Sequence, residues 1–480
     1  MAVSDTFAFA PHRPRAPQPY DPRYDPLVAP DPGAGRAYAP SYWAASAGPA
    51  PADDGPITGD VDADVVVIGS GSTGISTALA LAEEHGVRAT VLEANQLAWG
   101  CSSRSGGQGQ NASGRLKRSQ WIERWGLDTA RRLDAEIRAG FDHFRALTRR
   151  IPCDAEEGGH LWVAHRPERM PMLRAEAEVM RTQFGYAPRI LDAETLRREH
   201  CDEREAAGAL FEPEGVGIHP LKFTYGLARA ARTLGVRLHT GSPVQGWETH
   251  GGVHHLRTPG GTVRARRVAV CTGGYTGQAL TPLLRNRLMP ILSNSTVTRP
   301  LTAAERAACG FRSRAFLTDT RTLRFYYRLL PDGRLQIGSR SAIAGADAED
   351  PVHQRLLTDA IARKFPPLAG IEIEHQWWGG VDVSHDMMPR IVQPDVAASV
   401  WYALGYGGNG VSFSTWAGKR LAERIVGLDA GRDAFRLPIY DSPLEYPNVM
   451  GAVRSELFAP FRRLGQQLLY RWYWLRDEKL

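Results

Sequence analysis

The order of apolar and polar positions predicts a strand, a helix and a second strand near the start of the chain. Residues 64–68 form a β-branched run, glycines follow, and 89–93 form a second apolar run that ends in an acid. Between the runs, apolar side chains recur at helical spacing, at Ile75, Leu79, Leu81 and Ala82. Apolar runs without alternation are typical of strands that are covered on both faces. The pattern therefore predicts a strand–helix–strand unit with both strands buried.

Further along, the same reasoning predicts more elements. Helical periodicity dominates 117–150, and a strand-like run at 159–164 begins a different region. Later elements are short strands at 236–239 and 267–270, a hairpin of 322–330 and 335–338 turned by Pro331-Asp332-Gly333, a strand ending at Leu404-Gly405, and a helix over 411–427. Strand–helix units at both ends with antiparallel material between them predict an α/β fold, in which an α+β substrate domain interrupts a nucleotide-binding domain.

The expected organisation begins with a proline-rich arm, residues 1–60. This arm carries 12 of the 33 prolines, so no helix or central strand runs through it. Its aromatic pair Tyr42-Trp43 either anchors the arm to the body or leaves it a loose tail, and the pattern does not decide between the two. The other parts are the nucleotide-binding domain (61–158, 215–285 and 375–430), the substrate domain (159–214 and 286–374) and a C-terminal helical segment (431–480).

A glycine motif, Gly69-Ser70-Gly71-Ser72-Thr73-Gly74, lies directly between the first strand and its helix. Gly69 permits a tight turn, Gly71 lets the backbone approach a pyrophosphate, and Gly74 lets helix and strand pack closely. The free N–H groups at the helix N-terminus suit the anion. Glu93 is placed to accept hydrogen bonds from ribose hydroxyls, and an acid there disfavours a 2′-phosphate. The motif therefore predicts NAD or FAD, not NADP.

Composition narrows the class of protein further. The 480 residues are 43% hydrophobic and 23% charged, which is typical of a globular protein, and the formal charge is +6. Only five of the 58 basic residues are lysines, and the arginines are scattered among acids, which argues against nucleic-acid binding. The five cysteines are widely spread without a CxxC pair, so a reduced, cytoplasmic setting is expected. No apolar stretch predicts an integral membrane segment.

The segment after Glu93 carries a family resemblance. Residues 97–108 include Cys101-Ser102-Ser103-Arg104-Ser105-Gly106-Gly107, which is similar to the loop along the flavin in the D-amino-acid-oxidase (DAO) superfamily. Further motifs of that superfamily are matched at 41–46, 217–220, 269–275, 327–334 and 405–411. Within the superfamily the chain most resembles the gamma-glutamylputrescine oxidase type. The resemblance implies a glutathione-reductase-type, Rossmann-like domain that binds FAD without a covalent link.

The resemblance also implies which residues hold the flavin. Val244 is expected on a strand-like segment beside the adenine, and the loop 407–410 is expected to open the last helix and face the flavin with its N–H groups. The full set is Gly69, Gly71, Ser72, Thr73, Gly74, Glu93, Ala94, Cys101, Ser102, Ser103, Arg104, Ser105, Gly106, Gly107, Gln108, Val244, Thr272, Gly273, Gly274, Gly407, Gly408, Asn409, Gly410 and Val411.

Two positions depart from the pattern of the subgroup. Ser103-Arg104-Ser105 stands where Gly-Arg-Asn is usual, which removes an amide donor and a flexible glycine near the flavin. Cys101 occupies a position usually held by a small residue. A buried structural thiol is favoured there over a covalent flavin attachment.

The expected reaction needs no catalytic triad, no paired carboxylates and no metal. The resemblance implies oxidation of the C–N bond of a small-molecule amine, either gamma-glutamylputrescine-like or another secondary amine. A hydride passes to flavin N5, the imine is hydrolysed, and the flavin is reoxidised by O2, giving H2O2, or by another acceptor. None of the five lysines matches the lysine that assists oxygen in sarcosine-type oxidases, so a dehydrogenase stays open.

The catalytic candidates are Arg324, Tyr326, Tyr327 and His385. Alternation along the hairpin places Arg324, Tyr326 and Arg328 on one face and Tyr327 on the other, and leaves open which face meets the flavin. An inward arginine suits a substrate carboxylate. His160 and His219 are further candidates for a polar role, and residues 377–380 with Asp382 are expected to form a loop near the cofactor.

Two other functions stay open. One is an N-alkyl amino-acid oxidase or dehydrogenase of the sarcosine or glycine type. The other is a non-catalytic flavoprotein that serves as a scaffold at a partner or membrane surface. The scaffold hypothesis rests on an apolar stripe at helical spacing, formed by Phe458, Phe461, Leu464, Leu468, Trp472 and Leu475. Packing of this stripe against the protein's own body is favoured, and the oligomeric state is left open.

Overall fold

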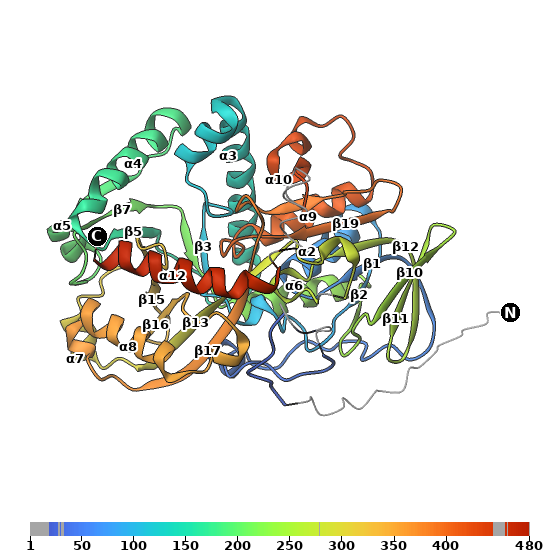
Figure 1. The fold of residues 1–480 in the computed structure, drawn as a ribbon, viewed down its shortest axis with the longest axis horizontal. Helices are drawn as coiled ribbons and strands as arrows, with labels where there is room; N and C mark the ends of the chain where they lie inside the picture. Colours follow the sequence, from blue (N-terminus) through green and yellow to red (C-terminus); the bar gives the residue numbers. More distant parts are fainter. Residues whose placement is uncertain are drawn as a thin grey trace.

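Two large sheets lie beside one another in the computed structural model, which describes residues 19–26, 29, 33–277, 279–444, 457 and 459–479 (Figure 1). The first sheet holds the predicted strand–helix–strand unit and lies in the right half of the view. The second sheet lies in the left half and is largely antiparallel. This arrangement confirms the predicted fold class, an α/β protein with an added antiparallel sheet.

The first sheet has the strand order β10-β11-β12-β1-β2-β9, with β19 beside β12 and β18 beside β19. Its strands are β1 (Val61–Ile68), β2 (Thr90–Leu92), β9 (Arg237–His239), β10 (Gly246–His250), β11 (Val253–Thr258), β12 (Gly261–Val270), β18 (Arg390–Val392) and β19 (Val400–Leu404). β1 is parallel to both β2 and β12, and β19 is parallel to β12. Helices α2 (Ser72–His85), α6 (Pro220–Thr233), α9 (Ser414–Ile425) and α3 (Arg118–Arg150) pack around it.

The second sheet has the order β17-β13-β16-β15-β14-β5-β7-β6. Its strands are β5 (His160–Ala164), β6 (Arg189–Asp192), β7 (Gly208–Glu212), β13 (Met289–Pro300), β14 (Phe316–Asp319), β15 (Tyr326–Leu329), β16 (Arg334–Ser339) and β17 (Ile373–Val383). Helices α4 (Met170–Phe184), α5 (Ala193–Glu199), α7 (Ala303–Ala308) and α8 (Pro351–Lys364) accompany it. A small third sheet joins β3 (Gln108–Gln110), β8 (Gly215–Gly217) and β4 (Glu156–Glu157).

The remaining helices complete the described chain. They are α1 (Tyr42–Ser46), α10 (Pro438–Asp441), α12 (Arg462–Glu478) and the 3-10 turns η1 (Cys101–Ser103), η2 (Pro167–Arg169), η3 (Gly273–Tyr275), η4 (Pro282–Leu284), η5 (Gly345–Asp347), η6 (Pro366–Leu368), η7 (Asp433–Arg436) and η8 (Ala459–Phe461). Among the described residues, no helix is both long enough and apolar enough to cross a membrane.

Most predicted elements form within a few residues of their expected bounds, with three exceptions. The arm was expected to contain no helix, but α1 forms at Tyr42–Ser46, in the stretch without proline between Pro40 and Pro49. Residues 377–380 and Asp382 were expected in a loop, but they lie in strand β17, paired with β13. A strand pattern was missed there because two glycines interrupt it. Val244 was expected on a strand, but it lies in the irregular segment before β10. The division into domains remains a prediction. β17 extends the second sheet to Val383, beyond the boundary expected at 374.

The described part of the N-terminal arm is packed onto the body. Trp43 is buried, and its ring nitrogen donates a hydrogen bond of 2.8 Å to the Ser105 carbonyl. Tyr24 is also buried, stacked on Tyr275 and edge-on to Trp99. The aromatic pair Tyr42-Trp43 therefore anchors the arm, and the loose-tail alternative is wrong for these residues. Residues 1–18 lie outside the described part of the chain.

Candidate active site

The glycine motif follows strand β1 and leads into helix α2. Gly69 has φ +100°, and a Cβ there would lie 2.7 Å from the Cys271 carbonyl oxygen, so only glycine fits this turn. A Cβ on Gly74 would lie 1.9 Å from the Gly69 carbonyl oxygen and 3.3 Å from Val67 Cγ1. This close approach confirms the packing role predicted for Gly74. The N-cap residue of α2, Gly71, has no side chain to cap the helix; the Ser72 N–H donates to Ser102 Oγ at 2.9 Å, which leaves the N–H groups of Thr73 and Gly74 for an anion.

Glu93 follows strand β2 and lies beside the motif. Its Oε2 accepts hydrogen bonds from the Ser70 backbone N–H at 2.9 Å and from Ser70 Oγ at 2.7 Å. Its Oε1 accepts a hydrogen bond of 2.9 Å from the Asn95 N–H. Burial raises the pKa of Glu93, although these hydrogen bonds oppose the shift. Glu93 also lines the cavity, at the position where an acceptor of ribose hydroxyls was expected.

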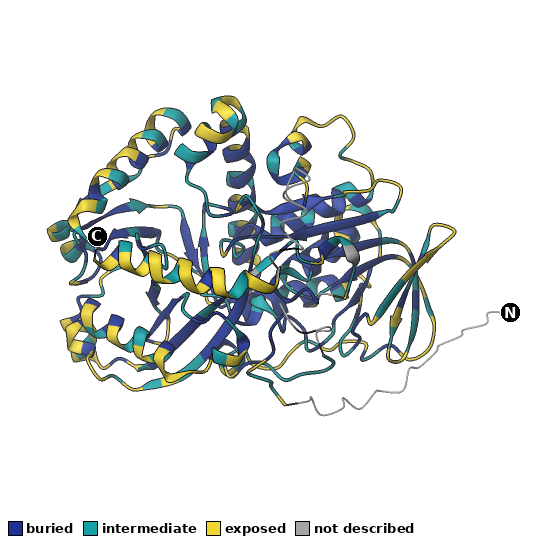
Figure 2. Cartoon of the chain, in the orientation of Figure 1, coloured by how far each residue is buried: buried dark blue, intermediate teal, exposed yellow. Residues whose placement is uncertain are grey.

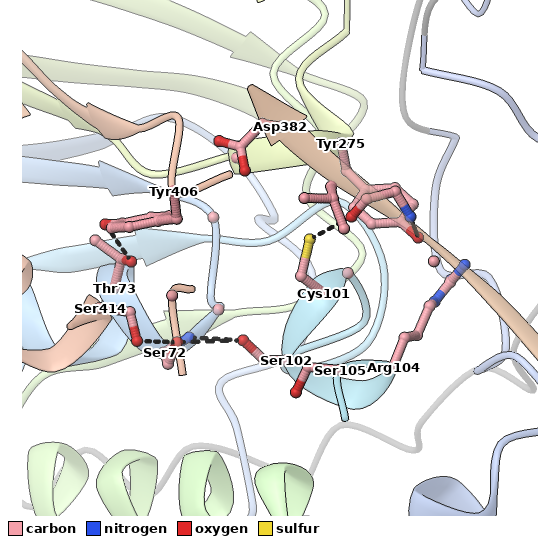
Figure 3. A pocket seen from close by; sticks show the side chains of 18 of the residues that line it. Ser72, Thr73, Cys101, Ser102, Arg104, Ser105, Tyr275, Asp382, Tyr406 and Ser414 are labelled. Atoms are coloured by element: carbon pink, nitrogen blue, oxygen red, sulfur yellow. Dashed lines mark hydrogen bonds between the residues drawn. The ribbon is translucent and has the colours of Figure 1, made fainter. Parts of the chain in front are cut away.

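The predicted flavin loop crosses in front of the motif as η1. Figure 3 shows Ser102, Ser72 and Ser414 in one row, in which the Ser72 N–H donates to Ser102 Oγ at 2.9 Å and the Ser72 and Ser414 hydroxyls lie 2.8 Å apart. The N-terminus of α9, which also has no side-chain cap, thus meets the N-terminus of α2. The loop 407–410 precedes α9 but does not open it directly, since the helix begins at Ser414.

Cys101 lies in the same loop with its Sγ donating to the Gly380 carbonyl at 2.9 Å. Burial raises the pKa of Cys101 to about 12, and the negative charge of Asp382 adds to this shift. The group is therefore a neutral thiol near pH 7, and thiols of this kind are poor nucleophiles. Cys101 is half-buried at the cavity wall, and its neutral, hydrogen-bonded thiol favours the structural role over a covalent flavin attachment.

One cavity of about 480 Å³ connects these parts to the second sheet. Twenty of the 24 predicted flavin residues line it, from Gly69 in the motif to Val411 before α9. The four that do not are Gly74, Ser103, Gly107 and Gly274. Gly107 and Gly274 instead allow backbones to approach, because a Cβ would lie 2.3 Å from the Ile218 oxygen and 2.9 Å from the Gly380 oxygen, respectively. Ser103 Oγ donates to the Trp99 carbonyl at 2.9 Å.

The structure separates the catalytic candidates. Arg324 and Tyr326 line the cavity. Tyr327 is on the opposite face of β15, in the apolar core of the second sheet with Phe365 nearby, so the prediction of a catalytic role for Tyr327 is wrong. His385 is also corrected, because it is not among the lining residues and its Nε2 lies 3.2 Å from the guanidinium of Arg390. The alternation expected along the hairpin holds, but Arg324 lies just before the strand.

The further histidine candidates differ in the same way. His219 caps helix α6, where its Nδ1 accepts from the Lys222 N–H at 3.1 Å. Burial, aided by Lys222, lowers the pKa of His219 to about 3. His160 lies behind the cavity, with Nε2 2.7 Å from the hydroxyl of the lining residue Thr318 and Nδ1 3.4 Å from Glu212. A continuous polar chain therefore leads from the cavity through His160.

Four arginines and two acids make up the charged lining of the cavity: Arg104, Arg115, Arg324, Arg340, Glu93 and Asp382. Arg104 is buried, and its guanidinium carbon lies 4.2 Å from the Trp99 ring centroid and 4.9 Å from that of Tyr275. Arg324 makes no hydrogen bond or ion pair with another described residue, and its Nε is buried. This excess of positive charge suits anionic groups.

Several lining residues were not predicted, notably Arg340, Thr318, Ser293, Arg115 and Tyr406. Tyr406 Oη lies 2.8 Å from Thr73 Oγ1 and so links the loop before α9 to the glycine motif, as Figure 3 shows. Tyr406 is inside a motif that the resemblance had already identified, so a signal for it existed. The others come from strands and loops whose cavity face depends on long-range pairing.

The comparisons with known proteins identify the class. The chain matches the family described as FAD dependent oxidoreductase (DAO) over residues 64–424, and it belongs to that family. The site fits this cofactor, because an uncapped helix N-terminus, glycines without room for a Cβ and a buried acid meet in one cavity. The protein is thus an FAD-dependent oxidoreductase, as the sequence predicted.

Particular relatives place it more closely within that class. Gamma-glutamylputrescine oxidoreductase of Escherichia coli (strain K12) is 34% identical over 412 residues, which cover 84% of this chain and 93% of the relative. A probable oxidoreductase OrdL of Rhizobium meliloti is 31% identical over 435 residues, which cover 87% and 93%.

Solved structures share the fold at lower identity. Glycine oxidase from Geobacillus kaustophilus aligns with TM-score 0.63 and 20% identity, covering 76% of this chain and 95% of that one. L-Proline dehydrogenase from P. horikoshii aligns with TM-score 0.64 and 18% identity, covering 80% of this chain and 97% of that one.

Proposed function

We propose that this enzyme oxidises the C–N bond of an amine that also carries a carboxylate, either a gamma-glutamylated amine or another secondary amine. The observation that carries the proposal is the pair Arg324 and Arg340, which line the cavity without a carboxylate partner among the described residues. The likeness to gamma-glutamylputrescine oxidoreductase, whose name specifies an amine of this kind, supports the same substrate class.

Of the five buried arginines that the structure describes outside the cavity, four have acidic partners, and the fifth, Arg328, donates to the Ile218 carbonyl instead. Arg118 pairs with Asp134 at 2.7 Å, Arg321 with Asp319 at 2.6 Å and Arg420 with Glu136 at 2.7 Å. By contrast, burial lowers the pKa of Arg324 even though Asp319 opposes the shift, and burial lowers that of Arg340. A desolvated guanidinium without a counter-ion gains most from a ligand that brings one. A substrate carboxylate provides that charge.

Tyr326 is held in one orientation at the cavity wall. Its hydroxyl lies 3.0 Å from Ser293 Oγ and 2.7 Å from Ser295 Oγ. A Cβ on Gly106 would lie 3.0 Å from its ring, so the ring rests against the predicted flavin loop. We assign Tyr326 the role of orienting the substrate chain beside that loop.

Bound FAD supplies the two-electron oxidation in this reaction. The substrate nitrogen must be neutral when the C–N bond is oxidised, so the site has to take up a proton from an ammonium group. Thr318, His160 and Glu212 form a chain of polar contacts that leads away from the cavity. We assign to this chain the movement of the proton, with Thr318 Oγ1 as the contact that faces the substrate.

The electron acceptor is a separate question. None of the residues described as lining the cavity is a lysine, and Lys364 is buried among Glu203, Glu205 and Asp319 instead. This observation favours a dehydrogenase as the second candidate, beside an oxidase that yields H2O2. N-alkyl amino acids remain the alternative substrates, because they too combine an amine with a carboxylate.

Anaerobic bleaching of the flavin tests the substrate class. The holoenzyme is mixed with gamma-glutamylputrescine, sarcosine, glycine and, as the control without a carboxylate, putrescine. We expect bleaching at lower concentration with a carboxylated amine than with putrescine. Equal responses would contradict the carboxylate assignment, and no response to any amine would favour the scaffold hypothesis. Admitting air after bleaching then tests the acceptor, because an oxidase recovers its colour as fast as it turns over and releases peroxide.

A further inference from the structure

The C-terminal helix α12 lies across the surface of the second sheet with its apolar side outward. It runs over the front of the left half of the molecule in Figure 1, and Figure 2 shows that most of its surface is exposed. Phe461, Leu464, Leu468, Trp472 and Leu475, the outer stripe, are 39% to 63% exposed. The expectation that this stripe packs against the body is therefore wrong. Its first predicted member, Phe458, lies outside the described residues.

Polar contacts hold the opposite side of α12 to the body. At its start, Arg463 pairs with Asp25 of the N-terminal arm and donates to the Ile343 carbonyl at 3.3 Å. At its end, buried Asp477 accepts from Arg169 at 3.1 Å and from the Thr322 N–H at 2.6 Å. Gln466 is buried between these ends. A helix that covers a protein core normally shows the reverse arrangement.

The exposed apolar residues are concentrated in this segment. Of the 13 large hydrophobic side chains that are exposed in the described chain, eight lie between Leu457 and Leu475. They include two tryptophans, Trp472 and Trp474, whose rings combine an apolar body with a polar N–H. Such a concentration in one segment indicates a binding surface, since exposed apolar side chains are otherwise scattered.

The charges around the outer stripe are positive. Arg471 and Lys479 are exposed and have no acidic partner among the described residues. The two acids of the helix are used elsewhere, because Asp477 binds Arg169 and Glu478 binds Arg321 at 2.5 Å. A helix with leucines and Trp472 on its outer side and unpaired basic residues beside them matches the chemistry of an anionic lipid surface.

The size of the face argues against a second copy of the chain. The 17 residues of α12 span about 25 Å, and a helix is about 10 Å wide, so the face has an area of a few hundred Å². A stable protein interface takes about 800 Å² from each partner. The stripe alone does not reach that size, whereas an interfacial helix needs only its own face.

We propose that the outer stripe of α12 binds the surface of an anionic phospholipid bilayer, with Arg471 and Lys479 contacting the headgroups. The polar contacts at both ends keep the helix ordered on the body, so binding immerses its outer face alone. The enzyme then rests on the membrane through this helix without crossing it. This inference does not depend on which amine is the substrate.

Flotation of the flavin-loaded enzyme with vesicles tests the proposal. One set of vesicles is phosphatidylcholine, and the other is an equimolar mixture with phosphatidylglycerol. The stripe variant carries Leu464→Gln, Leu468→Gln and Leu475→Gln. The matched control carries Val352→Gln, Val396→Gln and Leu428→Gln, three exposed positions elsewhere. We expect the stripe variant to bind anionic vesicles about tenfold less or weaker still, and the control to bind as the parent does.

The charge variant carries Arg471→Gln and Lys479→Gln. We expect a loss of about fivefold in anionic-vesicle binding for each basic residue, and no change on phosphatidylcholine. Flavin absorbance and turnover of a soluble amine show that each variant is folded, since none of the substituted residues lines the cavity. No binding by the parent, or equal binding by the stripe variant, overturns the proposal. Self-association that depends on the stripe, without vesicle binding, overturns it in favour of a second copy.

Discussion

Replacing Arg324 with glutamine is expected to weaken substrate binding without lowering the stability of the protein. The side chain lines the cavity, and its buried Nε has no hydrogen-bond partner in the described chain. If a substrate carboxylate accepts one or two hydrogen bonds from this guanidinium, each is worth about 1.5–3 kcal/mol. The loss of one such bond corresponds to a rise of about 10- to 150-fold in KM. We expect KM to carry most of the effect, because the interaction is present before and during the reaction.

Arg324→Gln and Arg321→Gln are expected to change the free energy of unfolding differently. Arg324 is half-buried and has no ion-pair partner among the described residues, so Arg324→Gln is expected to leave the free energy of unfolding of the apoprotein unchanged or to raise it. Arg321 binds Asp319 at 2.6 Å and Glu478 at 2.5 Å. Breaking that buried network with Arg321→Gln is expected to cost about 3–5 kcal/mol.

The assay compares two amines and two variants. Half-saturation of anaerobic bleaching is measured for gamma-glutamylputrescine and for putrescine, and urea unfolding is measured on each apoprotein. The reasoning is refuted if Arg324→Gln weakens both amines equally, because the lost contact would then not be to a carboxylate. It is also refuted if Arg324→Gln destabilises the protein as much as Arg321→Gln does.

Three further predictions follow from single positions. Gly74→Ala is expected to cost about 3 kcal/mol of stability and most of the bound flavin, because its Cβ would lie 1.9 Å from the Gly69 oxygen. The control Gly465→Ala has open space around it and is expected to stabilise α12 by about 1 kcal/mol. Thermal unfolding and flavin content measure both effects, and an unaffected Gly74→Ala protein contradicts the packing argument. Cys101→Ala is expected to keep its flavin, and acid precipitation of the parent protein is expected to release all of the flavin, since the pKa of Cys101 is raised to about 12 and the thiol is neutral. Flavin that stays in the pellet of the parent but not in the pellet of the variant would show a covalent link. Burial lowers the pKa of His219 to about 3 from an ordinary value of 6.5, so between these pH values the unfolded chain binds a proton there that the folded chain does not, and the free energy of unfolding falls by up to about 1.4 kcal/mol for each unit by which the pH is lowered. His219→Asn keeps an acceptor for the α6 cap and is expected to reduce this pH dependence in urea titrations at pH 7 and pH 5. An unchanged pH dependence contradicts the assignment.

The cofactor half of the site was predictable because its signals are local. Gly69, Gly71 and Gly74 lie between the end of β1 and the first turn of α2, and Glu93 directly follows β2, so a short segment carries the geometry. Similarly, the loop at 101–108 could be identified from its own residues. Local steric limits on glycine and the 2- and 3.6-residue periods decide such features without the rest of the chain.

The substrate half depended on contacts between distant segments. Tyr326 and Tyr327 are neighbours in sequence, but Tyr326 faces the cavity and Tyr327 the core, because β15 is paired between β14 and β16 in one register. The sequence predicted that these side chains alternate between two faces, but it did not predict which face lines the cavity, since a one-residue change of register exchanges the two faces. Arg340 and Thr318 could not be predicted for the same reason.

The sequence by itself determined the family, its cofactor FAD and the presence of an apolar stripe at helical spacing near the C-terminus. Only the tertiary structure decided which way that stripe faces. Helical periodicity specifies that one side of α12 is apolar, but the ion pairs of Arg463 with Asp25 and of Asp477 with Arg169 turn the polar side inward. Those partners lie more than 300 residues away along the chain, and no local pattern records them.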